Sequence, residues 1–205
     1  MKSVQENSVL QKYQCLSNFP KTLCLSSIAG ALALLSLALP VIDWYCFDYT
    51  AIVVQEEYWR LISGHLVHSS LSHAFWDISL FALLSAYLEK KDPQRLMMGI
   101  TLAAVGLSTF MLTPFVEIER YSGLSGVIYC LLIMAYWEWQ KKHSVLIGLI
   151  PAVLVIGKTL MEWQSSEAVF VSDGWSVFVE AHLLGAAIGI AAILYIQFRK
   201  NSTPA

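Results

Sequence analysis

Charged residues are scarce in this 205-residue sequence, of which Asp, Glu, Lys and Arg make up 14%. An average soluble domain contains about 25%, so a soluble globular fold is not expected. The formal net charge is -2, and Lys and Arg form no dense run. The composition therefore gives no indication of a nucleic-acid partner, which an excess of basic residues would favour.

Metal-binding and disulfide patterns are also missing. The four cysteines show no C-x-x-C spacing and no clustering with histidine, so we expect neither a zinc site nor a disulfide framework. His65, His68 and His73 are an alternative ligand set, but the H-E-x-x-H motif is absent. We therefore expect no metal and no cofactor. We expect His68 to form a hydrogen bond in an outer loop.

Long apolar runs are what the sequence has in abundance, with 57% hydrophobic residues. A bilayer core of about 30 Å requires roughly 20 apolar residues per helix. We therefore predict an all-α polytopic membrane protein with six transmembrane helices. The first run is longer than the core of a signal peptide, and we interpret it as a retained helix. The predicted spans are Thr22–Ile42, Ser72–Leu88, Leu96–Val116, Gly123–Trp139, Val145–Met161 and Val177–Phe198.

The positive charges predict the orientation, because Lys and Arg near helix ends stay in the cytoplasm. With the N-terminus inside, ten of the 13 Lys and Arg residues are cytoplasmic, and only Arg60 and Arg120 lie in outer loops. Both termini are then cytoplasmic. The predicted division is a cytoplasmic N-terminal segment (1–21), a membrane domain (22–198) and a cytoplasmic tail (199–205).

Polar residues inside a span cost about 2.5–3.5 kcal/mol at the bilayer centre, so each one needs an explanation. Lys158 lies near the outer end of the fifth span, four residues before Glu162. We interpret it as a snorkelling side chain with an ion-pair partner and no function. The remaining polar residues of interest are His73, Asp77, Ser125 and His182.

These four residues are expected at one depth, because the second, fourth and sixth spans all enter from the outside and have them in their first turns. A hydroxyl and an imidazole at one depth indicate a nucleophile, Ser125, and a general base, His182. Tyr129 lies one turn after Ser125 and is expected to pack on the imidazole. Gly185 and Gly189 form a small-xxx-small pair that allows two helices to approach closely.

The serine lies in the motif Gly123-Leu124-Ser125-Gly126. Glycines permit a tight turn, and the free N–H groups of a helix start stabilise an oxyanion. Taken alone, Gly-x-Ser-Gly is a weak signal, because small residues also fill the interfaces between membrane helices. We therefore assign Gly123, Gly126, Gly185 and Gly189 to helix packing.

Together these motifs resemble the rhomboid intramembrane serine proteases, which are six-helix enzymes with a Ser/His dyad. The resemblance extends from Tyr58 to the end of the sixth span. It includes a Trp-Arg pair in the first outer loop, two histidines at the start of the second span, the nucleophile motif and the general-base motif. The matching residues are Trp59, Arg60, His68, His73, Asp77, Gly123, Leu124, Ser125, Gly126, Tyr129, Ala181, His182, Gly185 and Gly189.

The resemblance implies that Ser125 attacks the scissile carbonyl and that His182 accepts its proton. It further implies that His73 and the Ser125 amide line an oxyanion hole. Leu124 and Tyr129 are expected to line this hole or to orient the groups that do. Asp77 departs from the family, which usually has Asn at this position. An ionised carboxylate that faced the oxyanion would repel it. Asp77 is then protonated, turned away, or engaged in holding His73 or Arg60. A structural or orienting role is our first hypothesis, and donation to the oxyanion is the second.

The compact size and the stretch from Gly64 to Asp77 look like the rhombosortase branch. This resemblance implies substrates with a C-terminal tail of a glycine-rich motif, one hydrophobic helix and a basic end. They would be cut near the outer face of a bacterial inner membrane. The sequence does not determine whether water or an amine then releases the product from the serine. The partners are then membrane lipid and such transmembrane proteins. The alternative functions are a catalytically silent binder of transmembrane clients and, more weakly, a small transporter, for which no inverted repeat is found.

Overall fold

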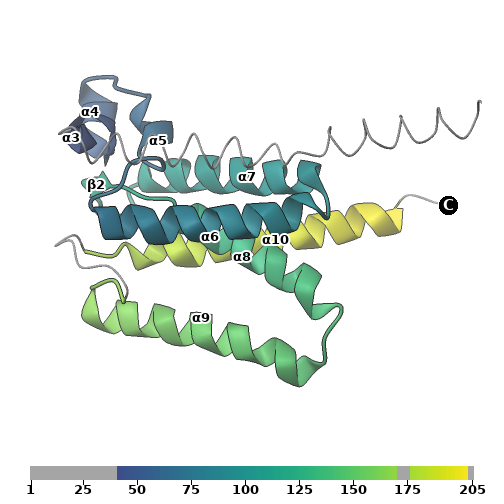
Figure 1. Cartoon of the computed structure of the whole chain (residues 1–205). Coiled ribbons are helices and arrows are strands. Elements are labelled where there is room, and N and C mark those ends of the chain that lie inside the picture. The colour runs from purple at the N-terminus through teal and green to yellow at the C-terminus, as the bar shows by residue number, and fades with distance from the viewer. Residues whose placement is uncertain (1–40, 170–175, 203–205) are drawn as a thin grey trace, which may run out of the picture.

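The structure is a computed structural model that describes residues 41–169 and 176–202. This part of the chain is mostly helical, with most of its long helices running side by side (Figure 1). The predicted segment 1–21 and nearly all of the first predicted span lie outside the described residues. The long helices are α6 (Leu71–Glu89), α7 (Pro93–Met111), α8 (Ser125–Gln140), α9 (Val145–Ser165) and α10 (Val179–Ser202).

These five helices coincide with the last five predicted spans. Among the described residues, two stretches are long and apolar enough to cross a membrane by length and composition: Leu71–Glu89 and Val179–Arg199. The all-α character is therefore confirmed, and the count of six spans stays a prediction. The third span is shorter than predicted, because α7 ends at Met111 and Pro114 follows, where a helix is interrupted.

Local signals explain where the helices begin. Ser70 is the N-cap of α6, and its hydroxyl accepts the backbone N–H of His73 at 3.1 Å. Asp92 caps α7 in the same way for two backbone N–H groups, and Pro93 occupies its first turn, where no N–H is needed. The start of α6 therefore fixes the height of His73 in the bundle.

Helices α8 and α10 form the centre of the bundle and touch through their backbones. A Cβ atom on Gly185 would lie 2.0 Å from the carbonyl oxygen of Gly126, and one on Gly189 would lie 2.8 Å from that of Cys130. Only glycine allows this separation. The close approach expected for a small-xxx-small pair is thus present. It sets Ser125, the residue before Gly126, beside the first turns of α10.

Helix α9 lies apart from the other long helices at the lower edge of Figure 1. Among the long helices, α8 and α10 are the two that α9 contacts to a significant extent. Most of its large apolar side chains are exposed, as expected for a surface that faces lipid. These exposed residues are Leu146, Ile147, Leu149, Ile150, Val153, Leu154, Ile156, Leu160, Met161 and Trp163.

Short elements cover the end of the bundle where α6, α8 and α10 begin. They include β1 (Phe47–Asp48), which pairs antiparallel with β2 (Arg120–Tyr121), a pairing that the sequence did not predict. The buried guanidinium of Arg60 donates to Glu57 and to the carbonyls of Asp43 and Cys46. The short helices here are α3 (Ile42–Tyr45), α4 (Tyr49–Val54) and α5 (Arg60–Ser63).

His65 anchors the loop between α5 and α6. Its Nε2 lies 2.9 Å from the hydroxyl of Ser108 on α7, and that hydroxyl donates to the carbonyl of Leu61. Burial lowers the pKa of His65 to about 4, so the imidazole is neutral at physiological pH. This loop is therefore fixed against the bundle by a neutral hydrogen-bond chain.

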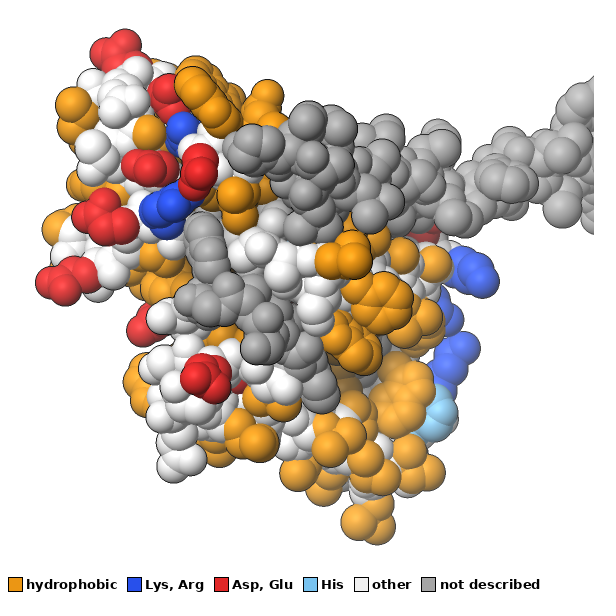
Figure 2. All heavy atoms as spheres, turned by 60° about the vertical axis from the view of Figure 1, so that its left-hand side comes forward, with side chains coloured by type: hydrophobic (Ala, Val, Ile, Leu, Met, Phe, Trp, Pro, Cys, Tyr) orange, Lys and Arg blue, Asp and Glu red, His pale blue; other side chains and the backbone are white. Residues whose placement is uncertain are grey.

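Charge is distributed unevenly between the two ends of the helices. Figure 2 shows acidic side chains gathered toward one side of the molecule and most Lys and Arg at the opposite edge. The acidic group precedes α6 or lies between α7 and α8, and it contains Asp43, Asp48, Glu56, Glu57, Glu117 and Glu119. The basic group lies at the other helix ends and contains Lys90, Lys91, Arg95, Lys141 and Lys142.

Candidate active site

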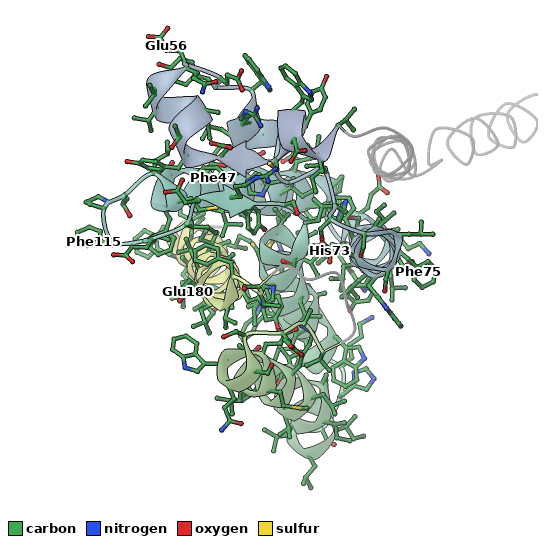
Figure 3. The ribbon with its side chains drawn as sticks, turned by 90° about the vertical axis from the view of Figure 1, so that its left-hand side faces the viewer. Phe47, Glu56, His73, Phe75, Phe115 and Glu180 are labelled. Atoms are coloured by element: carbon green, nitrogen blue, oxygen red, sulfur yellow. The ribbon has the colours of Figure 1, made fainter. Side chains whose placement is uncertain are left out.

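One cavity of about 470 Å³ lies between the first turns of α6, α8 and α10 and the last turns of α9. In Figure 3, His73 points from α6 toward the middle of the bundle, whereas Phe75 points away from it. The cavity brings together polar side chains from four helices. Those that concern the chemistry are His73, Asp77, Ser125, Tyr129, Lys158, Glu162 and His182.

Ser125 is the first residue of α8 and is half-buried in the wall of this cavity. Gly123 makes the turn before it with a φ of 115°, and a Cβ there would lie 2.7 Å from Nε2 of His73. Both the backbone angle and the space therefore require glycine. The amide of Ser125 is among the first N–H groups of α8, which have no partner within the helix.

His182 is buried on α10, with 4% of its surface exposed. The ring of Tyr129 stacks on its imidazole, with centroids 4.4 Å apart and planes within 3° of parallel. The hydroxyl of Tyr129 is hydrogen-bonded to that of Thr159 on α9 at 2.9 Å. The packing of these two rings is as the spacing predicted, and it fixes the plane of the imidazole. The orienting role of Tyr129 in the reaction stays a prediction.

Asp77 connects α6 with the turn that precedes Ser125. Its Oδ2 accepts the backbone N–H of Leu124 at 2.8 Å and lies 3.3 and 3.4 Å from Nε2 of His68 and of His73. These contacts fit an orienting carboxylate. The alternative in which Asp77 holds Arg60 is wrong, because the Arg60 guanidinium is directed to Glu57 and to two backbone carbonyls outside the cavity.

His68 lies in the loop between α5 and α6, as expected, but its side chain does not point outward. Its side chain is buried, with Nε2 facing Asp77. Its ring meets that of His73 edge-on at 5.0 Å. His68 precedes Ser70, the N-cap of α6, by two residues, and is therefore close in the chain to the first turns of that helix. The alternative three-histidine metal set does not converge, because Nε2 of His65 is bound to Ser108 instead.

Glu162 is the residue of the cavity that the sequence reasoning missed. Its predicted pairing with Lys158 is present, at 2.6 Å between Nζ and Oε1. Its other oxygen, Oε2, lies 3.4 Å from Nδ1 of His182. Because α9 continues past Met161 to Ser165, Glu162 lies on the helix and turns toward α10. The only sequence signal was an acidic residue four positions after a lysine within a span.

The model of the Rhomboid domain matches residues 55–199. Two proteins named Rhomboid protease GlpG, from two strains of Klebsiella pneumoniae, are each 26% identical to the chain over 154 residues. The alignments cover 74% of this chain and 53% of each relative. The chain thus spans about half the length of the curated relatives it matches.

Proposed function

This chain belongs to the rhomboid family, and from that premise we propose that it is an intramembrane serine protease with Ser125 as nucleophile and His182 as general base. The observation that supports this most is that both side chains line one cavity, although they come from different helices. The backbone contact between Gly126 and Gly185 holds the two helices in this arrangement. Such a pair is the minimum that acyl transfer by serine requires.

In the proposed reaction, Oγ of Ser125 attacks the scissile carbonyl carbon while Nε2 of His182 accepts the hydroxyl proton. The tetrahedral intermediate collapses as the C–N bond breaks, and the imidazolium returns the proton to the leaving amine. The product is an ester of Ser125. A water molecule, again deprotonated by His182, then hydrolyses this ester and releases the new carboxyl terminus.

The oxyanion of that intermediate is proposed to bind the Ser125 amide and the side chain of His73. The amide of Leu124 already donates to Asp77 and is thereby directed away from this task. We assign Asp77 to orientation: it holds Leu124 in place and lies beside both His68 and His73. A carboxylate that already accepts hydrogen bonds serves this role without facing the oxyanion.

We further propose the rhombosortase type of substrate, an exported protein with a glycine-rich motif followed by one hydrophobic helix and a basic end. Small residues at the scissile bond allow an extended backbone to approach the half-buried Ser125. The apolar wall of the cavity suits the hydrophobic helix. The residues of this wall include Trp76, Leu80, Leu83, Leu132 and Val155. The proposed location is a bacterial inner membrane, with the cavity open to the periplasm.

The test uses the detergent-solubilised protein and a fusion protein that ends in such a tail. The wild type should cleave the fusion, and Ser125→Ala should reduce the rate by about 10³-fold or more. Ser144→Ala is the matched control, because Ser144 is exposed at the opposite end of the bundle and should leave the rate unchanged. Cleavage that survives Ser125→Ala would exclude this nucleophile.

The alternative is a catalytically silent protein that binds transmembrane clients. The presence of both Ser125 and His182 in one cavity favours the enzyme. A fluorophosphonate probe, which labels activated serines, separates the two. An enzyme is labelled and loses the label in Ser125→Ala, whereas a silent binder captures the fusion protein without labelling or cleavage. Mass spectrometry of the product with an added amine then distinguishes hydrolysis from transfer.

A further inference from the structure

We propose that Glu162 is a positioning residue for His182, so that the site operates as a Ser125–His182–Glu162 triad. The inference rests on the proposed serine protease function. It assigns a role to a residue of α9 in addition to those of α8 and α10.

The first argument is the geometry of two buried atoms that face each other. Oε2 of Glu162 and Nδ1 of His182 are 3.4 Å apart. The two side chains are 2% and 5% exposed, and neither atom has another hydrogen-bond partner in the part of the chain that the structure describes. A buried polar atom without a partner destabilises the folded state. A bond from Nδ1–H to Oε2 satisfies both atoms with a small adjustment.

The second argument concerns what this bond does to the imidazole. A neutral histidine has one protonated nitrogen, and the partner of that nitrogen selects the tautomer. With the proton on Nδ1 toward Glu162, Nε2 has the lone pair that must accept the proton of Ser125. The stacked ring of Tyr129 fixes the plane in which this occurs. The carboxylate also stabilises the imidazolium that forms during the reaction.

The third argument is that the environment supports a charged Glu162. Its other oxygen, Oε1, accepts from Nζ of Lys158 at 2.6 Å and from the backbone N–H of Val169 at 3.3 Å. A buried carboxylate requires such partners. Because these two donors both use Oε1, Oε2 stays free for His182. Lys158, which the sequence indicated as a snorkelling residue, thus holds the acid of the triad.

Other titratable groups surround His182 and bear on the test. Tyr129 lies on α8, and Lys158 stands behind Glu162 on α9. His73 and Asp77 line the cavity on α6, and Asp77 faces the two histidines of that region. On α10 itself, Glu180 is exposed. Glu162 is the only carboxylate recorded within 4 Å of His182 among the described residues.

The experiment measures the second-order rate of Ser125 labelling by a fluorophosphonate probe as a function of pH, with Glu162→Gln against the wild type. We expect a loss of about 10²-fold or more and a shift of the pH midpoint to lower pH by about one unit, because the imidazolium loses its anionic partner. Glu162→Asp keeps the charge and should restore the wild-type midpoint. Glu167→Gln, the same change at a largely exposed position nearby, should leave rate and midpoint unchanged.

Wild-type rate and midpoint in Glu162→Gln, with labelling still lost in Ser125→Ala, would overturn the triad and leave the proposed protease intact. No labelling of the wild type would instead count against the proposed function. A readout independent of activity is the ¹⁵N NMR spectrum of labelled histidine. His182 should be protonated at Nδ1 in the wild type, and protonation at Nε2 would overturn the triad even if Glu162→Gln fails to fold.

Discussion

Asp77 joins groups from two separate parts of the chain. Its Oδ2 accepts the N–H of Leu124 from the turn before α8 and lies near two imidazoles at the start of α6. The position of the nucleophile is therefore tied to α6 through one oxygen atom. An amide oxygen accepts a hydrogen bond as a carboxylate does, although more weakly. Comparing Asn with Ala at position 77 therefore shows whether the site needs a hydrogen-bond acceptor there or a negative charge.

We predict that Asp77→Ala lowers the free energy of unfolding by about 1–3 kcal/mol, because the buried N–H of Leu124 loses its acceptor. Asp77→Asn should lose about 1 kcal/mol or less and keep most of the fluorophosphonate labelling. Denaturant unfolding in detergent measures the first effect and labelling measures the second. Equal damage by Asn and Ala would show that the charge, and not the acceptor, is required.

The contact between α8 and α10 is the element-level feature on which the site depends. Gly185 lies three residues after His182, and Gly126 directly follows Ser125. Their backbones are so close that one added carbon atom would overlap the Gly126 carbonyl. Because a helix moves as a rigid unit, a wider gap at Gly185 displaces His182 from Ser125 as well.

We predict that Gly185→Ala lowers the thermal unfolding midpoint and reduces fluorophosphonate labelling by at least about tenfold, since a displacement of about 1 Å costs up to 10²-fold in rate. Gly157→Ala is the matched control, because a Cβ at Gly157 meets nothing within 4 Å. That variant should keep the wild-type midpoint and labelling. Equal tolerance of both substitutions would contradict the close contact.

At the scale of the whole molecule, the two ends of the bundle differ in charge. The cavity lies between helix ends on the side where the acidic residues gather, and Lys and Arg flank the opposite helix ends. In a membrane this asymmetry favours the basic end in the cytoplasm. The cavity would then face the periplasm, where the proposed exported substrate would present its tail.

The orientation predicts the outcome of reporter fusions. A fluorescent protein fused after Ala205 should fluoresce, and alkaline phosphatase fused there should be inactive, because both report a cytoplasmic position. Phosphatase fused after Glu119, in the connection between α7 and α8, should be active because this connection lies at the acidic end. The reverse pattern at the two sites would place the cavity in the cytoplasm.

Local properties of the sequence determined where the long helices lie and which residues form the nucleophile motif. The apolar runs predicted the positions of the five described long helices, because lipid-facing helices need length and hydrophobicity that are visible residue by residue. Spacing within a helix predicted the stacking of Tyr129 near His182 and the close approach at Gly185. The nucleophile motif was visible because glycine has a conformational role that no other residue fills.

Only the tertiary structure decided which residues from different helices share the cavity. Glu162 and His182 lie on separate helices, and nothing in their local sequence indicates that they face each other. His68 lies in the loop where it was expected, but the sequence did not predict that its side chain faces Asp77, and the pairing of β1 with β2 joins segments far apart in the chain. Such contacts depend on how helices rotate and pack, which is set by the sum of many weak contacts and not by any single motif.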